Sequence, residues 1–236
     1  MDLTKLFKWT SEITIVDGKG EPVMSGKTPL VLYLQVIGDA DLSHARKQAL
    51  KASKILRREL RDKESDNHAA MLPDYENLEE KALYNMIILA ESLELRRAAM
   101  ETAKRPKEPK KPKSDANLEQ QEKYETALED FDTKVTELIN ERTTELVEIR
   151  KNELKGRSKE ELVTIFVEST IGSLCQAEML RTFNSWCAYL GTFLDKKRTK
   201  RGFNSFKDYE NAAPELKSQI VSGYFQLEMG GEDLKN

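Results

Sequence analysis

The sequence predicts an α+β protein that is mostly helical, with a small antiparallel β meander near its N-terminus. Short segments of alternating apolar residues, separated by turn residues, occupy residues 9–37. From about residue 39 onward, apolar residues recur at spacings of three and four, which is typical of amphipathic helices. The composition agrees, because 39% hydrophobic and 33% charged residues describe a charge-rich, helix-rich chain.

A proline-rich spacer is expected to divide the chain. Pro106, Pro109 and Pro112 recur every third residue among lysines, which is the repeat of a polyproline II helix and excludes an α-helix. We therefore expect an α+β domain over residues 1–103, an exposed Pro/Lys-rich spacer over residues 104–116 and a helical domain over residues 117–236.

The meander is expected to contain three strands. Residues 9–16 alternate in polarity, and the Asp-Gly-Lys-Gly sequence at 17–20 then predicts a turn. A short edge strand is predicted near Val23, beside Pro22. Residues 30–37 are apolar on both faces, which predicts a strand that is central or covered on both sides.

Two helices are expected to complete the N-terminal domain. The first runs from an N-cap at Asp39 or Asp41 to about residue 63, with an apolar face and a basic opposite face. The second runs roughly over residues 74–103, after Pro73, with apolar positions that include Leu89 and Leu93.

The C-terminal part is expected to be a helical hairpin or bundle. A long acidic helix is predicted over residues 117–155, and its apolar positions Leu128, Phe131, Val135 and Leu138 follow two heptads. This helix either forms a coiled coil or, as we favour, packs on the next helix, which is predicted over residues 158–194. That helix opens with a Ser-Lys-Glu-Glu capping box and is expected to form the core. A last helix is predicted after Pro214.

Two cysteines lie in the predicted core helix. Cys175 and Cys187 are twelve residues apart, so they project at different heights and angles from one helix and cannot pair while it is intact. We expect them to be buried, reduced and without a metal.

The sequence gives little support for catalysis. Asp39, Asp41 and His44 resemble a metal site superficially, but carboxylates at a strand-to-helix junction are expected to cap the helix. There is no phosphate-binding glycine loop, nucleophile elbow or paired-histidine motif. We therefore predict no enzyme activity, no catalytic residues, no cofactor and no bound metal.

Charge and hydropathy suggest a cytosolic protein. The net charge of −3 makes no overall case for nucleic acid or an anionic membrane. No apolar segment reaches transmembrane length, and the N-terminus lacks the apolar core of a signal peptide.

Two apolar sets are candidate protein-binding positions. Leu6, Phe7 and Trp9 form one set near the N-terminus, and Leu128, Phe131 and Val135 form the other on the acidic helix. Internal packing is the alternative for both sets. Basic residues in two stretches are candidate phosphate contacts if the protein binds nucleic acid, an interpretation that we do not favour. They are Lys107, Lys110, Lys111, Lys196, Lys197, Arg198, Lys200 and Arg201.

Three stretches carry a resemblance to a known group of proteins. They are residues 31–42 with their basic continuation to Asp62, residues 118–124 after the spacer, and residues 203–217. In element order and composition these stretches resemble tailed-bacteriophage tail-morphogenesis proteins of the tail assembly chaperone type.

The resemblance implies a non-enzymatic protein that binds other phage proteins during assembly in the host cytoplasm. The expected client is the tape-measure or the tail-tube protein. The long spacer and the extended acidic helix exceed the compact form of such chaperones. A virion structural component of the tail or of head completion is therefore an alternative, and a nucleic-acid-binding accessory protein is another. The oligomeric state is left open.

Overall fold

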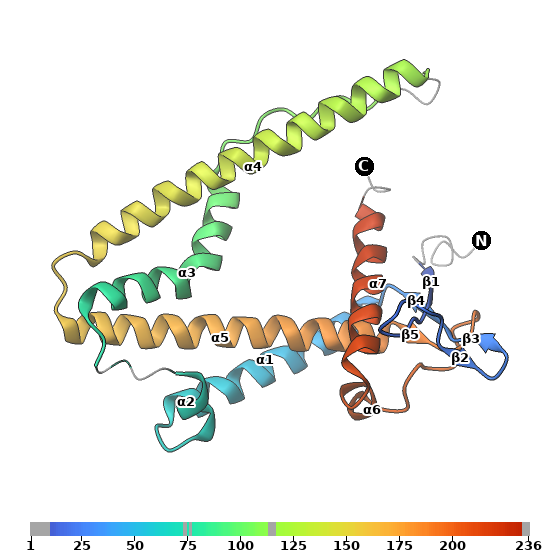
Figure 1. The fold of residues 1–236 in the computed structure, drawn as a ribbon, viewed down its shortest axis with the longest axis horizontal. Helices are drawn as coiled ribbons and strands as arrows, with labels where there is room; N and C mark the ends of the chain where they lie inside the picture. The colour runs from blue at the N-terminus through green and yellow to red at the C-terminus, as the bar shows by residue number, and fades with distance from the viewer. Residues whose placement is uncertain (1–9, 73–74, 76, 113–116, 233–236) are drawn as a thin grey trace. The chain divides into compact units, whose positions relative to one another are not determined.

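The computed structural model describes residues 10–72, 75, 77–112 and 117–232, and the side chains up to residue 227. The fold is α+β and mostly helical, with a small antiparallel sheet near the N-terminus, as predicted (Figure 1). The chain forms two compact units. Unit 1 comprises Met1–Arg58 and Cys175–Asn236, and unit 2 comprises Glu59–Leu174.

The compact units group the chain differently from the predicted division at residues 104–116. Helices α1 (Asp39–Arg61) and α5 (Lys159–Leu190) each begin in one unit and end in the other. The first 58 residues pack with the last 62 because strand β5 and helix α7 complete the N-terminal sheet. Pairing between residues so distant in the sequence leaves no signal in local periodicity.

The sheet of unit 1 has three strands in the order β1–β4–β5. Strand β1 (Thr10–Thr14) and strand β5 (Thr192–Phe193) both pair antiparallel with β4 (Val31–Gln35). The central place of β4 confirms what its two apolar faces predict. Strands β2 (Met24–Ser25) and β3 (Thr28–Pro29) form a separate hairpin around Gly26, whose positive φ of 69° suits glycine.

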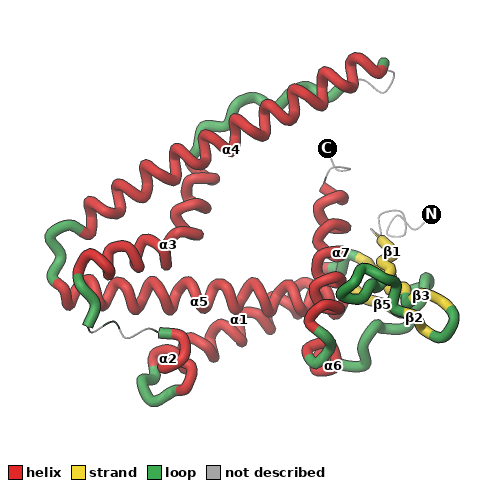
Figure 2. The backbone as a smooth tube through the Cα atoms, in the orientation of Figure 1, coloured by secondary structure: helices red, strands yellow, loops and turns green. Residues whose placement is uncertain are grey.

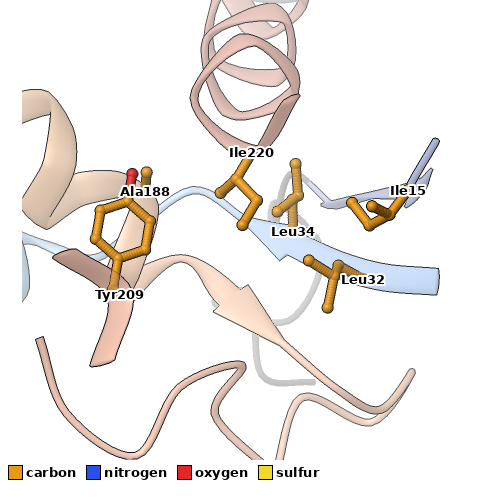
Figure 3. Close-up of a cluster of buried hydrophobic side chains, with 6 residues drawn as sticks. All are labelled: Ile15, Leu32, Leu34, Ala188, Tyr209 and Ile220. Atoms are coloured by element: carbon orange, nitrogen blue, oxygen red, sulfur yellow. The ribbon is translucent and has the colours of Figure 1, made fainter. Parts of the chain in front are cut away.

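The sheet packs against helices through one apolar cluster. Side chains from the strands meet α5, α6 (Phe206–Glu210) and α7 (Pro214–Glu232). Figure 3 shows the buried members, which are Ile15, Leu32, Leu34, Ala188, Tyr209 and Ile220. Gly223 brings α7 close to the sheet, since a Cβ there would lie 2.9 Å from the side chains of both Ile13 and Leu34.

Strand β5 ends the core helix earlier than the sequence predicts. Helix α5 was expected to reach residue 194, but it ends at Leu190 and the chain then enters the sheet. Gly191 forms this junction, and its carbonyl accepts a hydrogen bond of 2.9 Å from the amide of Gln35. A Cβ at Gly191 would lie 2.5 Å from the Tyr224 ring and 2.7 Å from the Gln35 carbonyl oxygen. Only glycine fits this crossing without displacement of backbone.

We expect Gly191→Ala to lower the free energy of unfolding by about 2 kcal/mol, because the added methyl group must push backbone and a buried ring apart. Gly172→Ala in α5 is the matched control, since a Cβ there meets nothing within 4 Å. The control should raise stability by about 0.5–1 kcal/mol through its better helix propensity. Urea denaturation measures both, and equal effects of the two substitutions would contradict the close packing at Gly191.

The expected caps are present at several helix starts. Ser158 and Glu161 make the reciprocal hydrogen bonds of a capping box at α5, and Ser205 caps α6. At α1, however, Gly38 is the N-cap, because its carbonyl accepts the amide of Leu42. Asp39 and Asp41 lie in the first turn, where they oppose the helix dipole rather than capping it. Cys175 and Cys187 are free and buried, as predicted.

Unit 2 contains α2 (Asp66–Met71), α3 (Glu80–Thr102), α4 (Leu118–Leu154) and the first half of α5. Helix α3 changes direction about midway along its length (Figure 1). Its buried residues Leu83 and Ile87 pack with Leu154, Leu162 and Phe166 from α4 and α5. Among the other helices α4 packs mainly on α3 and meets α5 near Leu154, so the favoured prediction that α4 packs along α5 is wrong. The expected start of α3 near Pro73 and Asp74 lies outside the described residues.

One ion pair connects the three helices of unit 2. The Arg150 guanidinium on α4 donates two hydrogen bonds, of 2.7 and 2.8 Å, to the Glu91 carboxylate on α3. Ser169 on α5 donates a third, of 2.7 Å, to the same carboxylate. Burial alone would raise the pKa of Glu91, but the hydrogen bonds from Arg150 and Ser169 outweigh it and hold the pKa below its ordinary value.

Candidate protein-interaction surfaces

The first predicted apolar set cannot be placed. Leu6, Phe7 and Trp9 lie outside the described residues, so their role as partner-binding positions stays a prediction.

The second apolar set lies on α4 and is half-buried. Leu128, Phe131, Val135 and Leu138, here called the α4 seam, each keep part of their surface exposed. They are neither core residues nor a free apolar face. Their burial requires a neighbour along this half of α4.

The proline-rich spacer is that neighbour. At one end Thr102 accepts a hydrogen bond of 3.3 Å from Arg142 of α4, and at the other end Asn117 caps α4. The 25 residues of α4 between these points span about 37 Å. The described spacer residues 103–112 can cover about 31 Å of this distance if they are extended as polyproline II. Figure 2 draws the described part of the spacer, up to Pro112, as a loop beside α4.

The burial of the spacer follows its period of three. Pro106, Pro109 and Pro112 are half-buried, whereas the residues between them are exposed. One edge of the spacer thus faces inward. The expectation of an exposed spacer is correct for its charged residues and wrong for its prolines.

The spacer lysines point away from this packing. Lys107, Lys110 and Lys111 are exposed, and no described acidic residue forms an ion pair with them. They remain available to solvent or to an anionic partner.

The second basic stretch forms an ordered loop in unit 1. The Asp195 carboxylate accepts hydrogen bonds from the Thr199 and Lys200 amides, and these bonds hold its pKa below the ordinary value. Lys196 lies 3.6 Å from Glu12, and Arg201 lies 3.8 Å from Asp41 and over the Phe193 ring. Contacts within the unit therefore engage part of this predicted phosphate site. The remaining members, Lys197, Arg198 and Lys200, have no ion pair among the described residues.

A row of exposed aliphatic side chains lies on α3. Leu89 is 73% exposed, Leu93 is 60% exposed and Met100 is 44% exposed. We call these three residues the α3 aliphatic row. The sequence identifies Leu89 and Leu93 as apolar positions of this helix, and the structure shows that both are exposed. Helix α3 carries apolar residues on more than one side, so their periodicity does not identify which side packs.

A second exposed surface, which was not among the predicted sites, is the outer face of α1. Its basic residues were recognised as a solvent-facing stripe but not as a site. They line a shallow groove together with the exposed residues Leu50 and Ile55. The absence of any acidic residue from position 42 to position 58 was the signal that could have identified it.

The described residues contain neither a cluster of metal ligands nor a helix that could span a membrane. Among the described residues, no three His, Cys, Asp or Glu side chains gather as metal ligands. His44 instead lies edge-on to Trp186 with ring centroids 4.9 Å apart. Within the described part of the chain, each helix is too short or too polar to span a bilayer.

Comparison with known proteins supplies no relative. No protein-family model, no curated protein and no solved structure matches this chain.

Proposed function

We propose that the protein is a non-enzymatic assembly factor of a tailed bacteriophage that acts as a tail assembly chaperone in the host cytoplasm. It binds a tail component, the tape-measure or the tail-tube protein, through apolar helix surfaces. The phage assignment rests on the resemblance described under Sequence analysis. The mode of action rests on the surfaces of unit 2.

The α3 aliphatic row is the observation that carries the proposed mode of action. Leu89 and Leu93 are one helical turn apart and expose most of their side chains, and Met100 follows seven residues later. Isolated apolar residues are common on protein surfaces, but neighbouring ones within one turn form a patch that a partner can cover. Leucine and methionine also adapt to different client shapes, because their side chains are flexible and apolar.

The charge of unit 2 suits a protein that presents such a patch. Residues 59–174 contain 27 acidic and 19 basic side chains, a net charge of −8. These exposed charges keep the surface around the apolar row hydrated, so the protein stays dissolved while the row is accessible. A client with an exposed apolar helix would gain burial at this row without competing against the core of the unit.

Co-expression with the tape-measure protein of the same phage tests the proposal. We expect Leu89→Ser with Leu93→Ser to leave thermal stability within about 0.5 kcal/mol, because exposed positions contribute little to folding. The same double variant should reduce the soluble fraction of the client several-fold. Solubility is measured by fractionation of lysates, and stability by thermal melting of the purified protein.

Leu118→Ser is the matched control, because Leu118 is 72% exposed on α4 and lies outside the row. The control should keep the client soluble. If the double variant and the control both support the client equally, the α3 aliphatic row is not the binding surface. Failure of the parent protein to solubilise either the tape-measure or the tail-tube protein would contradict the chaperone function itself.

A further inference from the structure

The outer face of α1 is a basic surface without internal neutralisation. Five exposed cations share this face at helical spacing, and they are Arg46, Lys47, Lys51, Lys54 and Arg58. None of them forms an ion pair with a described residue. Leu50, 52% exposed, and Ile55, 41% exposed, lie among them. The basic α1 face therefore combines uncompensated positive charge with uncovered aliphatic surface.

The outer side of α4 carries the opposite charge. Residues 118–141 contain eight acidic and two basic side chains, and all eight carboxylates are exposed. Glu122 and Glu129 lie on the side of the helix opposite the α4 seam and Glu125 lies on its flank, and all three are exposed. Of the eight acidic residues in this segment, only Glu119 forms an ion pair with a described residue, which is Lys123.

The two faces belong to different compact units of opposite charge. Unit 1 contains 19 basic and 14 acidic side chains, a net charge of +5, whereas unit 2 has a net charge of −8. The overall charge of −3 hides this asymmetry. Because each copy of the chain carries both a basic and an acidic surface, these charges favour association between copies.

We propose that the basic α1 face binds the acidic outer side of α4 on a second copy of this chain. Helical carboxylates reach the five cations, and the stems of the acidic side chains cover Leu50 and Ile55. A nucleic-acid backbone would neutralise the cations but would leave these aliphatic residues uncovered. The contact is heterologous, because two different surfaces meet, so repeating it gives head-to-tail chains or a closed ring.

Sedimentation velocity of the full-length protein without any client tests this association, so its outcome is independent of the proposed function. At about 50 mM salt the mean mass should rise with protein concentration. At about 500 mM salt the dissociation constant should rise about tenfold or more, because exposed ion pairs are screened. A monomer at all concentrations in low salt would overturn the proposal.

Charge-reversed variants identify the two faces. Lys47→Glu, Lys51→Glu and Lys54→Glu reverse α1 in one triple variant, and Glu122→Lys, Glu125→Lys and Glu129→Lys reverse α4 in another. Each triple variant alone should fold, as circular dichroism reports, and should remain monomeric. A mixture of the two should associate again, because the acidic α1 of one variant then meets the basic α4 of the other.

A matched control reverses the same amount of charge elsewhere in unit 1. Lys19→Glu, Lys27→Glu and Lys197→Glu change exposed residues outside α1 and should leave association within about twofold of the parent. Equal loss of association in this control would overturn the proposal, because net charge alone would explain it. Failure of the mixture to associate would do the same.

Fluorescence anisotropy with a short DNA duplex tests whether the basic α1 face binds nucleic acid instead of a second copy of the chain. We expect the parent and the α1 variant to bind the duplex equally weakly. If the α1 variant loses strong, salt-dependent duplex binding while the parent remains monomeric, the basic α1 face serves nucleic acid and not a second copy.

Discussion

Replacement of Tyr224 by alanine should lower the free energy of unfolding of unit 1 by about 4 kcal/mol, the range for loss of a large buried aromatic side chain. Tyr224 is 1% exposed and packs with Ala45 and Cys187. Its hydroxyl accepts a hydrogen bond of 3.2 Å from the amide of Ile37. The substitution therefore leaves a cavity between α1, α5 and α7 and also removes the partner of a backbone donor.

Urea denaturation followed by the fluorescence of Trp186 measures this effect, because Trp186 lies in the same unit. Tyr224→Phe is the control, since it keeps the ring and removes only the hydroxyl. It should cost about 1 kcal/mol, the usual contribution of one hydrogen bond. A cost below about 1 kcal/mol for the alanine variant would show that Tyr224 does not hold these three helices together.

Replacement of Glu91 by alanine should destabilise unit 2 by about 2 kcal/mol at neutral pH, because the guanidinium of Arg150 loses its more buried carboxylate partner and keeps only the more exposed Glu153. The side chains of Glu91 and Arg150 are 14% and 27% exposed, so solvent compensates only part of the loss. Glu94→Ala is the control, since Glu94 lies on the same helix and is exposed. It should change stability by less than about 0.5 kcal/mol.

The contribution of Glu91 should depend on pH in a defined direction. Its pKa is lowered in the folded state, so the unfolded chain binds a proton more readily as the pH falls. The stabilisation is therefore complete above the unfolded carboxyl pKa of about 4.3 and is lost as the pH falls through the lower folded value. Urea midpoints of the parent and Glu91→Ala should converge as the pH falls below about 4.3, the ordinary pKa of a glutamate. A constant difference over that range would contradict the role assigned to the ion pair.

Local signals predicted most of the secondary structure correctly. The capping residues Ser158 and Asn117 mark the helices that follow them, and Gly156, with a positive φ of 80°, forms the turn between α4 and α5. The two-faced apolar pattern of residues 30–37 identified the central strand. These features depend on interactions within a few residues, which is why the sequence alone determines them.

Features that depend on contacts between residues far apart in the sequence were not predicted. Strand β5 is two residues long and follows a helix, so its pairing with Tyr33 and Leu34 has no local signature. The same reason explains the α4 seam, whose periodicity predicts a neighbour but not that the neighbour is the spacer. The α3 aliphatic row was missed because an apolar residue carries no mark of whether it is packed or exposed.

Unit 2 is one continuous segment of the chain, whereas unit 1 is built from the two segments on either side of it. This arrangement affects the order in which the units can fold on the ribosome. Residues 59–174 form a contiguous unit, so they can fold while the remainder of the chain is still being translated. The N-terminal strands cannot complete their sheet until β5 and α7 emerge, more than 150 residues after β4. During that interval the edge of β4 that later pairs with β5 is open to other strands. Slow translation would lengthen this exposure, and nascent unit 1 is therefore the part of the protein most dependent on protection during its own folding.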